Sequence, residues 1–326
     1  MNNIDYPSYS VVIRTLGTAG EKYLETLRSC ERQTIQPDFI LVYIPYDYAL
    51  PNESIGKEIY IRCDKGMVAQ RSNCANDVPS DYILFLDDDL SFDKDFVQLL
   101  FDGLLKNEGD CISPDVYSIH NNPLAIKIRD FLGGTRPHFN KEWSFKIRRN
   151  THYSYNPSPN NDVLKSQSGA GACALCKKTV YEKIHFEDER WMDNVRYSLG
   201  EDQVFFYKIY KYGFSLLTSF NAKLIHLDAG SGHEKSKSKL AFSAAYCRYI
   251  IWHRTILSEN KSLIKKLLCI SSLILGYTFS LPLKLGMAFK NRSISIFTSE
   301  VLGYYQAAKY VNTEEYKNIP SYYRGV

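Results

Sequence analysis

The sequence predicts an α/β protein with a mostly parallel sheet, helices on both faces of that sheet, and a C-terminal helical extension. Short runs rich in β-branched and aromatic residues alternate with amphipathic segments over the first hundred residues, as in repeated strand–helix units. Three aspartates, Asp87, Asp88 and Asp89, follow directly on one of these apolar runs. With 326 residues, the chain is long enough for one large α/β domain and an appendage.

The expected elements follow one another closely. We expect strands at 9–14, 39–44, 59–61 and 82–86, and helices at 21–33, 66–76 and 93–106. Leu24, Leu27 and Cys30 recur every three residues on one face of the helix at 21–33. Ser91 or Asp93 is expected to cap the helix that begins near residue 93.

The alternation stops between about residues 120 and 165, where Asn, Gly and Pro are frequent. A loop of that length inside a domain is usually functional or disordered, so we predict an insertion there. Small residues at 169–176 regain strand character, and a helix at 201–212 is expected to end at Gly213. These patterns predict one domain over residues 1–235 and a helical region over 236–326.

Positive charge is concentrated near the C-terminus. Residues 1–232 carry 26 basic and 31 acidic side chains, whereas residues 233–292 carry 11 and 2. Such a basic segment indicates an anionic partner. Nucleic acid is not expected, because the segment is apolar rather than interleaved with base-stacking aromatic residues.

The same segment contains a long apolar run. Residues 267–283 have no charge over 17 residues and are flanked by lysines. This is just below the roughly 18–20 residues that cross a bilayer. We therefore expect a buried hairpin or a re-entrant or in-plane helix, peripheral on an anionic membrane surface. A soluble helical appendage, a dimer interface and a true span remain alternatives.

The eight cysteines are spread singly, and the opening MNNIDYPSYS has no signal-peptide pattern. We therefore expect buried thiols rather than disulfides. Cys173 and Cys176 have the spacing of a metal or redox pair, but no second pair or suitably spaced histidine accompanies them, which favours a structural role.

The acidic cluster is the main functional signal. Adjacent carboxylates raise each other's pKa unless a cation neutralises them. A divalent metal with oxygen ligands, shared with a phosphate-bearing substrate, is the economical explanation. Sites in parallel sheets lie at the carboxyl ends of strands, where Asp87–Asp89 are expected. The alternative is a solvated acidic turn that caps the next helix.

Three enzyme classes place clustered aspartates after an apolar segment. Haloacid-dehalogenase-type phosphatases do so near the start of the fold and before Gly-Thr, whereas Leu90-Ser91 follow here. Terpene-type prenyltransferases carry the cluster on a helix of an all-helical protein, which the β-like run at 82–86 contradicts. The third class is the nucleotide-sugar glycosyltransferases, whose metal-bound diphosphate site has this pattern.

Over roughly residues 8–235 the chain resembles family 2 glycosyltransferases of the GT-A fold. Residues 10–15 are similar to that family's first strand, and Ser29 to Gln33 fit its S-x-x-x-Q pattern. Residues 66–73 resemble its G-x-x-x-x-R-x-N helix start, and residues 85–89 resemble its DxD strand.

Two further features of the family recur near the end of this region. Gly200-Glu201-Asp202 resembles its ED motif at a helix start, and His226 stands where metal-binding members carry a histidine. Many members also carry Asp-Asp-Gly-Ser after the second strand to contact the base. Here Tyr46 and Asp47 are the available substitutes, which leaves the base undetermined.

The resemblance implies an inverting, metal-dependent transferase of the hexosyl or deoxyhexosyl type, which moves a sugar from a nucleoside-diphosphate sugar to a hydroxyl. It implies that Asp89 and His226 bind Mn²⁺ or Mg²⁺, with His233 as the competitor of His226. Inversion in one displacement needs a base opposite the leaving group. Asp202 is the residue expected to act as that base, with Glu201 orienting it.

Further residues are expected to hold the donor. Asp87 is expected to contact the ribose or support the metal, and Asp88 to position its neighbours. Arg71 is expected to contact phosphate, with a surface salt bridge as the alternative. The glycines at 169 and 171 are expected to let the backbone approach donor or acceptor closely.

The resemblance and the basic apolar tail together imply extension of a lipid-linked glycan on the cytoplasmic face of the cell membrane, in surface polysaccharide synthesis. Arg248 and His253-Arg254 are expected to meet lipid phosphate. One alternative is a sugar-phosphate nucleotidyltransferase, which would need a better glycine-rich phosphate loop than residues 16–20. Another is a non-catalytic member that binds nucleotide-sugar or lipid.

Overall fold

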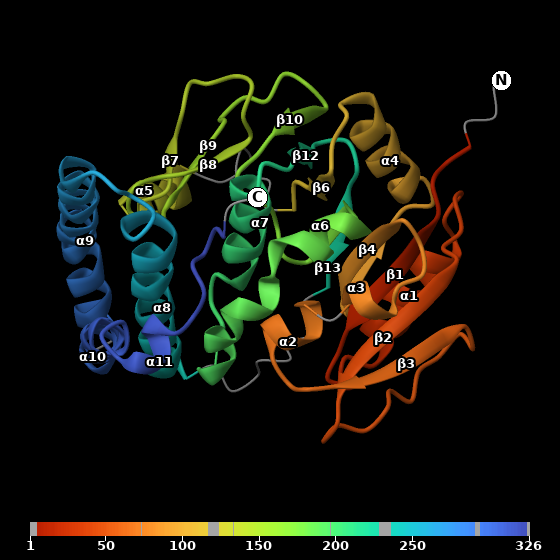
Figure 1. The fold of residues 1–326 in the computed structure, drawn as a ribbon, viewed down its shortest axis with the longest axis horizontal. Helices are drawn as coiled ribbons and strands as arrows, with labels where there is room; N and C mark the ends of the chain where they lie inside the picture. Colours follow the sequence, from red (N-terminus) through yellow and green to blue (C-terminus); the bar gives the residue numbers. More distant parts are fainter. Residues whose placement is uncertain are drawn as a thin grey trace.

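The protein is described by a computed structural model that covers residues 5–72, 74–116, 124–132, 134–195, 197–227, 236–290 and 294–324. A large central sheet carries helices on both faces, and a helical arm projects at one side (Figure 1).

The strands are β1 Tyr9–Arg14, β2 Phe39–Pro45, β3 Glu58–Cys63, β4 Tyr82–Asp87, β5 Leu90–Phe92, β6 Cys111–Pro114, β7 Arg136–Pro137, β8 Phe145–Ile147, β9 Tyr153–Tyr155, β10 Val163–Lys165, β11 Cys173–Lys177, β12 Leu216–Ser219 and β13 Leu224–His226. The α-helices are α1 Glu21–Glu31, α2 Met67–Ser72, α3 Cys74–Asp77, α4 Phe96–Lys106, α5 Leu124–Leu132, α6 Lys178–Ile184, α7 Glu201–Lys211, α8 Lys237–Trp252, α9 Leu263–Lys290, α10 Ser295–Tyr310 and α11 Glu314–Lys317. A 3₁₀ helix, η2, covers Phe186–Asn194, and a π-helical turn, η3, covers His253–Leu257.

The main sheet has eight strands in the order β10-β12-β6-β11-β4-β1-β2-β3. Strands β4, β1, β2 and β3 are parallel, which confirms the predicted α/β class. Strand β11 is antiparallel to both of its neighbours, β4 and β6. Because β1 and β4 are parallel neighbours in register, Arg14 and Asp87 lie side by side where the two strands end.

Alternate residues of the strands pack into two separate cores, because successive side chains of a strand point to opposite faces. Val11 and Ile13 face one core, in which α1 and α4 cover the sheet. Val12 faces the other, which includes residues of α2, α3, α6 and α7. This two-sided burial explains why the strands read as continuous apolar runs in the sequence.

Helices α8 and α10 and the residues near Tyr322 belong to the second core. Cys247 and Ile250 of α8, Ala307 of α10, and Tyr322 are buried in the same cluster as Phe205 of α7. The Tyr322 hydroxyl also donates to the carbonyl of Val204 at 2.7 Å. Residues after 236 therefore complete the interior of the α/β body.

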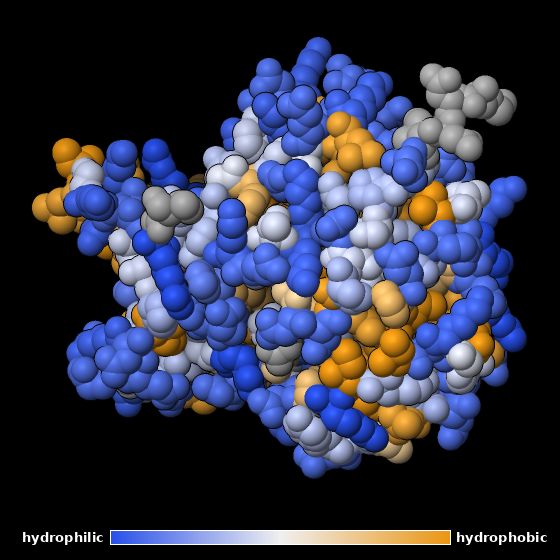
Figure 2. Space-filling view, turned by 45° about the vertical axis from the view of Figure 1, so that its right-hand side comes forward, coloured by the Kyte–Doolittle hydropathy of each residue, from blue (hydrophilic) through white to orange (hydrophobic). Residues whose placement is uncertain are grey.

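Helix α9 differs from the expected buried hairpin. It is one continuous helix of 28 residues with Pro282 inside it, and it lies at the outer edge of the molecule (Figure 1). Among the described residues, its segment Leu263–Gly286 is the one stretch long and apolar enough to cross a membrane, by length and composition alone. Most of that segment is exposed, and apolar residues gather at the tip of the projection (Figure 2).

The predicted insertion has a structure of its own. Its described part contains α5 and a three-stranded sheet in the order β7-β9-β8, and β10 joins the main sheet beside β12. These strands have only two or three residues each, too few for a periodic pattern.

Two local expectations were wrong. Cys111 and Cys176 are joined in a disulfide across β6 and β11, where the two residues are direct partners in the sheet. The six other cysteines are free and buried, as predicted. Asp95, rather than Ser91 or Asp93, precedes α4, and its side chain makes no capping hydrogen bond. Gly213 does end α7, with a φ of 84°.

A buried ionic triad fastens the C-terminal region to α7. The Glu189 carboxylate of η2 accepts from Lys208 Nζ at 2.8 Å and from Arg254 Nε at 2.6 Å. Arg254 also donates to the carbonyl of Pro320 at 2.8 Å. Arg254 is therefore a structural residue and does not face lipid phosphate as expected, and His253 beside it bonds the Tyr316 hydroxyl.

Replacing Glu189 with Gln is expected to reduce the free energy of unfolding by roughly 3–5 kcal/mol, because two cations are then buried without a counter-charge. Urea denaturation measures this. The matched control is Glu187→Gln, whose exposed side chain lies on the same helix.

The loss is expected to depend on pH. Burial opposes ionisation of Glu189, but Lys208 and Arg254 outweigh it and lower its pKa from 4.5 to about 2. A carboxylate with a lowered folded pKa stabilises fully above its unfolded pKa and loses that contribution as pH falls through the folded value. The gap between wild type and Glu189→Gln should therefore shrink from about pH 4.5 to about pH 2. A gap that stays constant over this range would contradict the triad's assigned role.

Candidate active site

The carboxyl edge of β1 and β4 gathers several charged side chains. Arg14 Nε donates to Asp87 Oδ1 at 2.7 Å, and the Thr15 hydroxyl donates to Asp88 Oδ2 at 2.5 Å. Burial raises the pKa of Asp88 to about 6, although the Thr15 hydrogen bond opposes the rise. The residues that end β1 therefore hold the first two aspartates in place.

Glu201 lies buried between two arginines. Its carboxylate is 3.3 Å from Arg14 Nη1 and 3.0 Å from Arg71 Nε. The contact with Arg71 is ionic, since neither of its two atoms has hydrogen-bond alignment. Both guanidinium groups also lie over the Phe85 ring, at 5.2 Å for Arg14 and 4.3 Å for Arg71. Glu201 thereby connects the start of α7 to the end of β1.

Asp202 is positioned by the backbone of residue 171. A Cβ on Gly171 would lie 2.7 Å from the Cβ of Asp202, so only glycine leaves room for this side chain. The carbonyl of Gly171 accepts from Arg71 Nη2 at 2.8 Å, and the next carbonyl, of Ala172, accepts from the Asp87 amide at 2.9 Å. The glycine segment therefore lies between the aspartates of β4 and the first turn of α7.

Asp89 and His226 come together through a separate two-stranded sheet. Strands β5 and β13 are antiparallel, with His226 opposite Leu90. Asp89 Oδ1 lies 3.4 Å from His226 Nε2, and the Leu227 amide donates to the carbonyl of Asp89 at 2.7 Å. The His226 ring is about one-third exposed, so this pair faces a space that a ligand can reach.

This pair fits a divalent metal as an incomplete donor set. Mg²⁺ and Mn²⁺ accept carboxylate oxygen and imidazole nitrogen, and Mg²⁺ usually takes one or two protein carboxylates plus substrate phosphates. Within the described ranges, no group of three or more His, Cys, Asp or Glu side chains could hold a metal ion by itself. A metal held by these two side chains would need further oxygen ligands from outside the described residues.

Residues 50–184 match the family model described as Glycosyl transferase family 2. The match covers about two fifths of the chain and shows a similarity to that family over this region. The matched residues include the aspartates of β4, Arg71 and Gly171. A comparison with curated proteins finds no match.

Solved structures of glycosyltransferases share the fold. GalNAc-T7 with UDP, GalNAc and Mn²⁺ superposes with a TM-score of 0.52 and 13% identity over 81% of this chain. This chain spans about half of that protein, 54% of its length. The mannosyltransferase PcManGT from Pyrobaculum calidifontis, with GDP-Man and Mn²⁺, gives a TM-score of 0.52 and 12% identity over 96% of this chain and 83% of that one. At these identities the likeness establishes the GT-A fold and the α/β class.

The structure brings most of the expected site residues to one edge of the sheet. Arg71 is fully buried against Glu201, so the alternative of a surface salt bridge is wrong. Its contact with phosphate stays a prediction. Asp47 lies exposed in the turn after β2, at the same edge of the sheet. His233 lies outside the described residues.

Sequence reasoning missed Arg14 and Thr15. Both follow an apolar strand directly, as Asp87 does, so the argument applied to β4 holds for β1 as well. It also missed the contact between Gly171 and Asp202, which depends on the pairing of β11 with β4 and leaves no local signal.

Replacing Gly171 with Ala is expected to lower turnover by about 10²-fold, because the new methyl group displaces the Asp202 side chain and a shift near 1 Å misaligns a reacting group. Release of nucleoside diphosphate from the donor measures this, beside a thermal melt that checks folding. Gly286→Ala is the control, since a Cβ there meets nothing within 4 Å. Unchanged turnover in a folded Gly171→Ala protein would contradict the role of Asp202.

Proposed function

We propose that this glycosyltransferase transfers a sugar, with inversion, from a nucleoside-diphosphate sugar to a hydroxyl of a lipid-linked glycan acceptor. It would work with Mn²⁺ or Mg²⁺ on the cytoplasmic face of the cell membrane, in surface polysaccharide synthesis. The observation that carries the chemistry is the placement of two functional groups at one edge of the sheet, the Asp89–His226 pair and the carboxylate of Asp202.

In this proposal Asp89 and His226 hold the divalent metal, which when bound would offset the charge that builds on the leaving diphosphate. Arg14 and Thr15 hydrogen-bond the carboxylates of Asp87 and Asp88. These two bonds would keep both carboxylates oriented toward the donor. The donor class is supported by the UDP and GDP-Man in the two solved structures, both with Mn²⁺. Asp47 would meet the base.

Asp202 takes the proton of the acceptor hydroxyl in this proposal. Burial raises the pKa of Asp202, and a raised pKa makes a carboxylate a stronger proton acceptor. The Gln203 amide donates to Asp202 Oδ1 at 2.8 Å and opposes that rise, so the charged form is held at the start of α7. Glu201 stays paired with Arg14 and Arg71 and orients the turn.

The membrane part of the proposal rests on α9. Its exposed side chains include Leu267, Leu275 and Phe279, each more than half accessible, and Lys265 and Lys266 lie near its start. Apolar residues beside lysines favour an anionic bilayer surface. An acceptor anchored in that surface would keep its glycan beside the catalytic body.

Replacing Asp89 with Asn is expected to remove metal-dependent donor binding, whereas Asp202→Asn should keep donor affinity and lower transfer by about 10²–10⁴-fold. The first change removes a negatively charged ligand atom, and the second removes only the proton acceptor. A thermal-shift panel of uridine, guanosine and thymidine diphosphate sugars with Mn²⁺ identifies the donor, and calorimetry then gives its affinity.

Asp95→Asn is the control for this pair, because Asp95 is exposed and its side chain caps nothing. Equal donor affinity of wild type and Asp89→Asn in the presence of Mn²⁺ would sink the assignment of the metal site. Normal transfer by Asp202→Asn would remove Asp202 as the base.

The double variant Leu267→Glu with Leu275→Glu is expected to move the protein from the membrane pellet to the supernatant. Two leucines that insert into the bilayer contribute roughly 3 kcal/mol or more, on the order of a hundredfold in partitioning. These substitutions are a better test than deleting the C-terminal region, because that region also fills the second core.

Leu105→Glu serves as the matched control, since Leu105 is an exposed leucine on α4, far from α9 in the fold (Figure 1). A wild-type protein that stays soluble in low salt without detergent would contradict the membrane proposal.

A further inference from the structure

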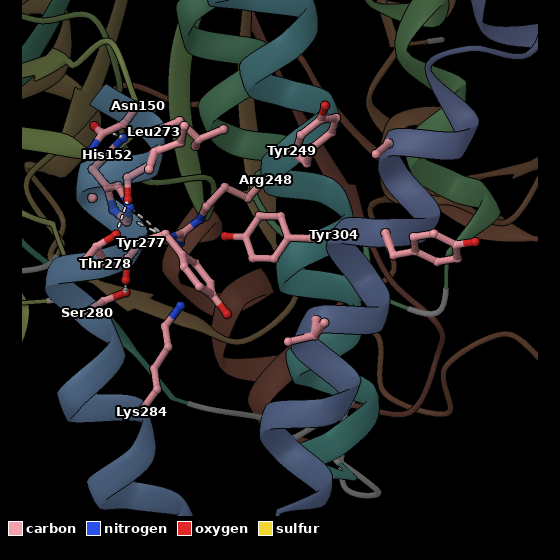
Figure 3. Close-up of a pocket in the computed structure, with 15 residues that line it drawn as sticks. Asn150, His152, Arg248, Tyr249, Leu273, Tyr277, Thr278, Ser280, Lys284 and Tyr304 are labelled. Carbon is pink, nitrogen blue, oxygen red and sulfur yellow. Dashed lines mark hydrogen bonds between the residues drawn. The ribbon is translucent and has the colours of Figure 1, made fainter. Parts of the chain in front are cut away.

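A cavity of about 510 Å³ opens between the C-terminal helices and the insertion. Arg248 of α8, Lys284 of α9 and His152 reach into it, together with tyrosines of α9 and α10 (Figure 3). None of the described side chains that line it is acidic. The cavity belongs to a different part of the molecule from the Asp89–His226 pair, which lies on β5 and β13.

The cavity has a positive environment. Arg248 Nη1 lies 2.9 Å from His152 Nε2, so the arginine donates to a neutral imidazole. Lys284 pairs with the carboxylate of Glu300. Burial and the charges of Arg248 and Arg148 lower the pKa of His152 to about 2. A neutral His152 leaves the positive charge of Arg248 available to an anion.

The walls of the cavity are apolar near its opening. Ile274 of α9 and Val301 and Tyr305 of α10 line it and are each about half exposed. Ile274 continues into the exposed apolar side of α9, beside Leu275. A ligand that fits both parts has an anionic head and an apolar tail. A free phosphate would satisfy only the cations.

A hydrogen bond joins the loop that carries His152 to the helix that carries Asp202. Gln203, which follows Asp202 in α7, donates from Nε2 to the carbonyl of Thr151 at 2.8 Å. Thr151 directly precedes His152. Gly134 makes room for the imidazole, because a Cβ on that residue would lie 2.6 Å from the ring. The loop that carries His152 is therefore held against the helix that carries Asp202.

We propose that this cavity binds the phosphate head of a membrane lipid, with Arg248 and Lys284 contacting the phosphate and the lipid tail lying along α9. The inference deepens the proposed function and rests on its membrane location. The cavity would then be a second anion site, separate from the candidate active site. The phosphate of a lipid-linked acceptor would bind there and hold its glycan near α7.

Vesicle sedimentation of the full chain, without donor or metal, tests this site. Wild type should prefer vesicles of phosphatidylcholine with phosphatidic acid over phosphatidylcholine alone. Arg248→Gln is expected to weaken binding to the anionic vesicles by about tenfold, the size of one lost hydrogen bond to a charged group. Ala308→Trp, which fills the cavity and keeps every charge, should weaken it similarly.

Lys239→Gln is the matched control, because it removes an exposed cation from the same helix, α8. Its effect should not exceed about fivefold, the general attraction of one lysine to an anionic surface. Melting curves confirm that each variant is folded. Unchanged binding by Ala308→Trp, or equal losses in Arg248→Gln and Lys239→Gln, would overturn the site in favour of general surface attraction.

A millimolar excess of glycerol phosphate distinguishes the source of the phosphate. We expect it to leave vesicle binding unchanged. Full release of the protein from the anionic vesicles would show that the cavity binds a soluble phosphate ester and would overturn the proposal of a lipid ligand. Binding to phosphatidylcholine vesicles should be the same in all these variants and lost only in the α9 double variant. The experiment thus distinguishes a wrong assignment of the lipid-phosphate site from a wrong membrane location. Neither result depends on sugar transfer.

Discussion

The buried carboxylate of Glu201 is the interaction on which the arrangement of the site depends. It pairs with Arg71 and shares Arg14 with Asp87, so that two adjacent buried cations both have a counter-charge. Removing one partner of a buried ion-pair group lowers the free energy of unfolding by far more than the whole group contributes to it, because an unpaired charge is left buried. Through these contacts one side chain of α7 sets the position of Asp87 on β4 and of the segment at Gly171.

This network separates two tasks within the short acidic motif. Asp87 and Asp88 are engaged by Arg14 and Thr15, whereas Asp89 turns toward His226 on another sheet. The chain bends at residues 88 and 89, between β4 and β5, so three adjacent carboxylates need not share one ligand. Under the proposed function, the same acidic run would contact the donor with one part and the metal with another.

The sequence predicted the parallel strands and their helices well, because strands such as β1 and β4 are buried on both faces and stand out as apolar runs. It did not predict β5 and β13, since three residues carry no periodic signal, although this small sheet is what brings His226 to Asp89. The disulfide between Cys111 and Cys176 and the pairing of Glu201 with Arg14 depend on contacts between distant segments. The aspartates that follow β4 directly were predicted from the sequence, whereas their partners Arg14 and Thr15 were missed.

The C-terminal region contributes to the interior as well as to the surface. Tyr322 is buried in the second core and bonds the backbone of α7, although 118 residues separate the two partners. Domains generally fold from the N-terminus as synthesis proceeds. Here, however, the helix that begins with Glu201 and Asp202 is not covered until residue 322 has been made, long after α9 has emerged. Completion of the α/β body must therefore follow synthesis of the exposed apolar helix α9. The nascent chain passes through a stage in which the apolar surfaces of α7 and α9 are both exposed.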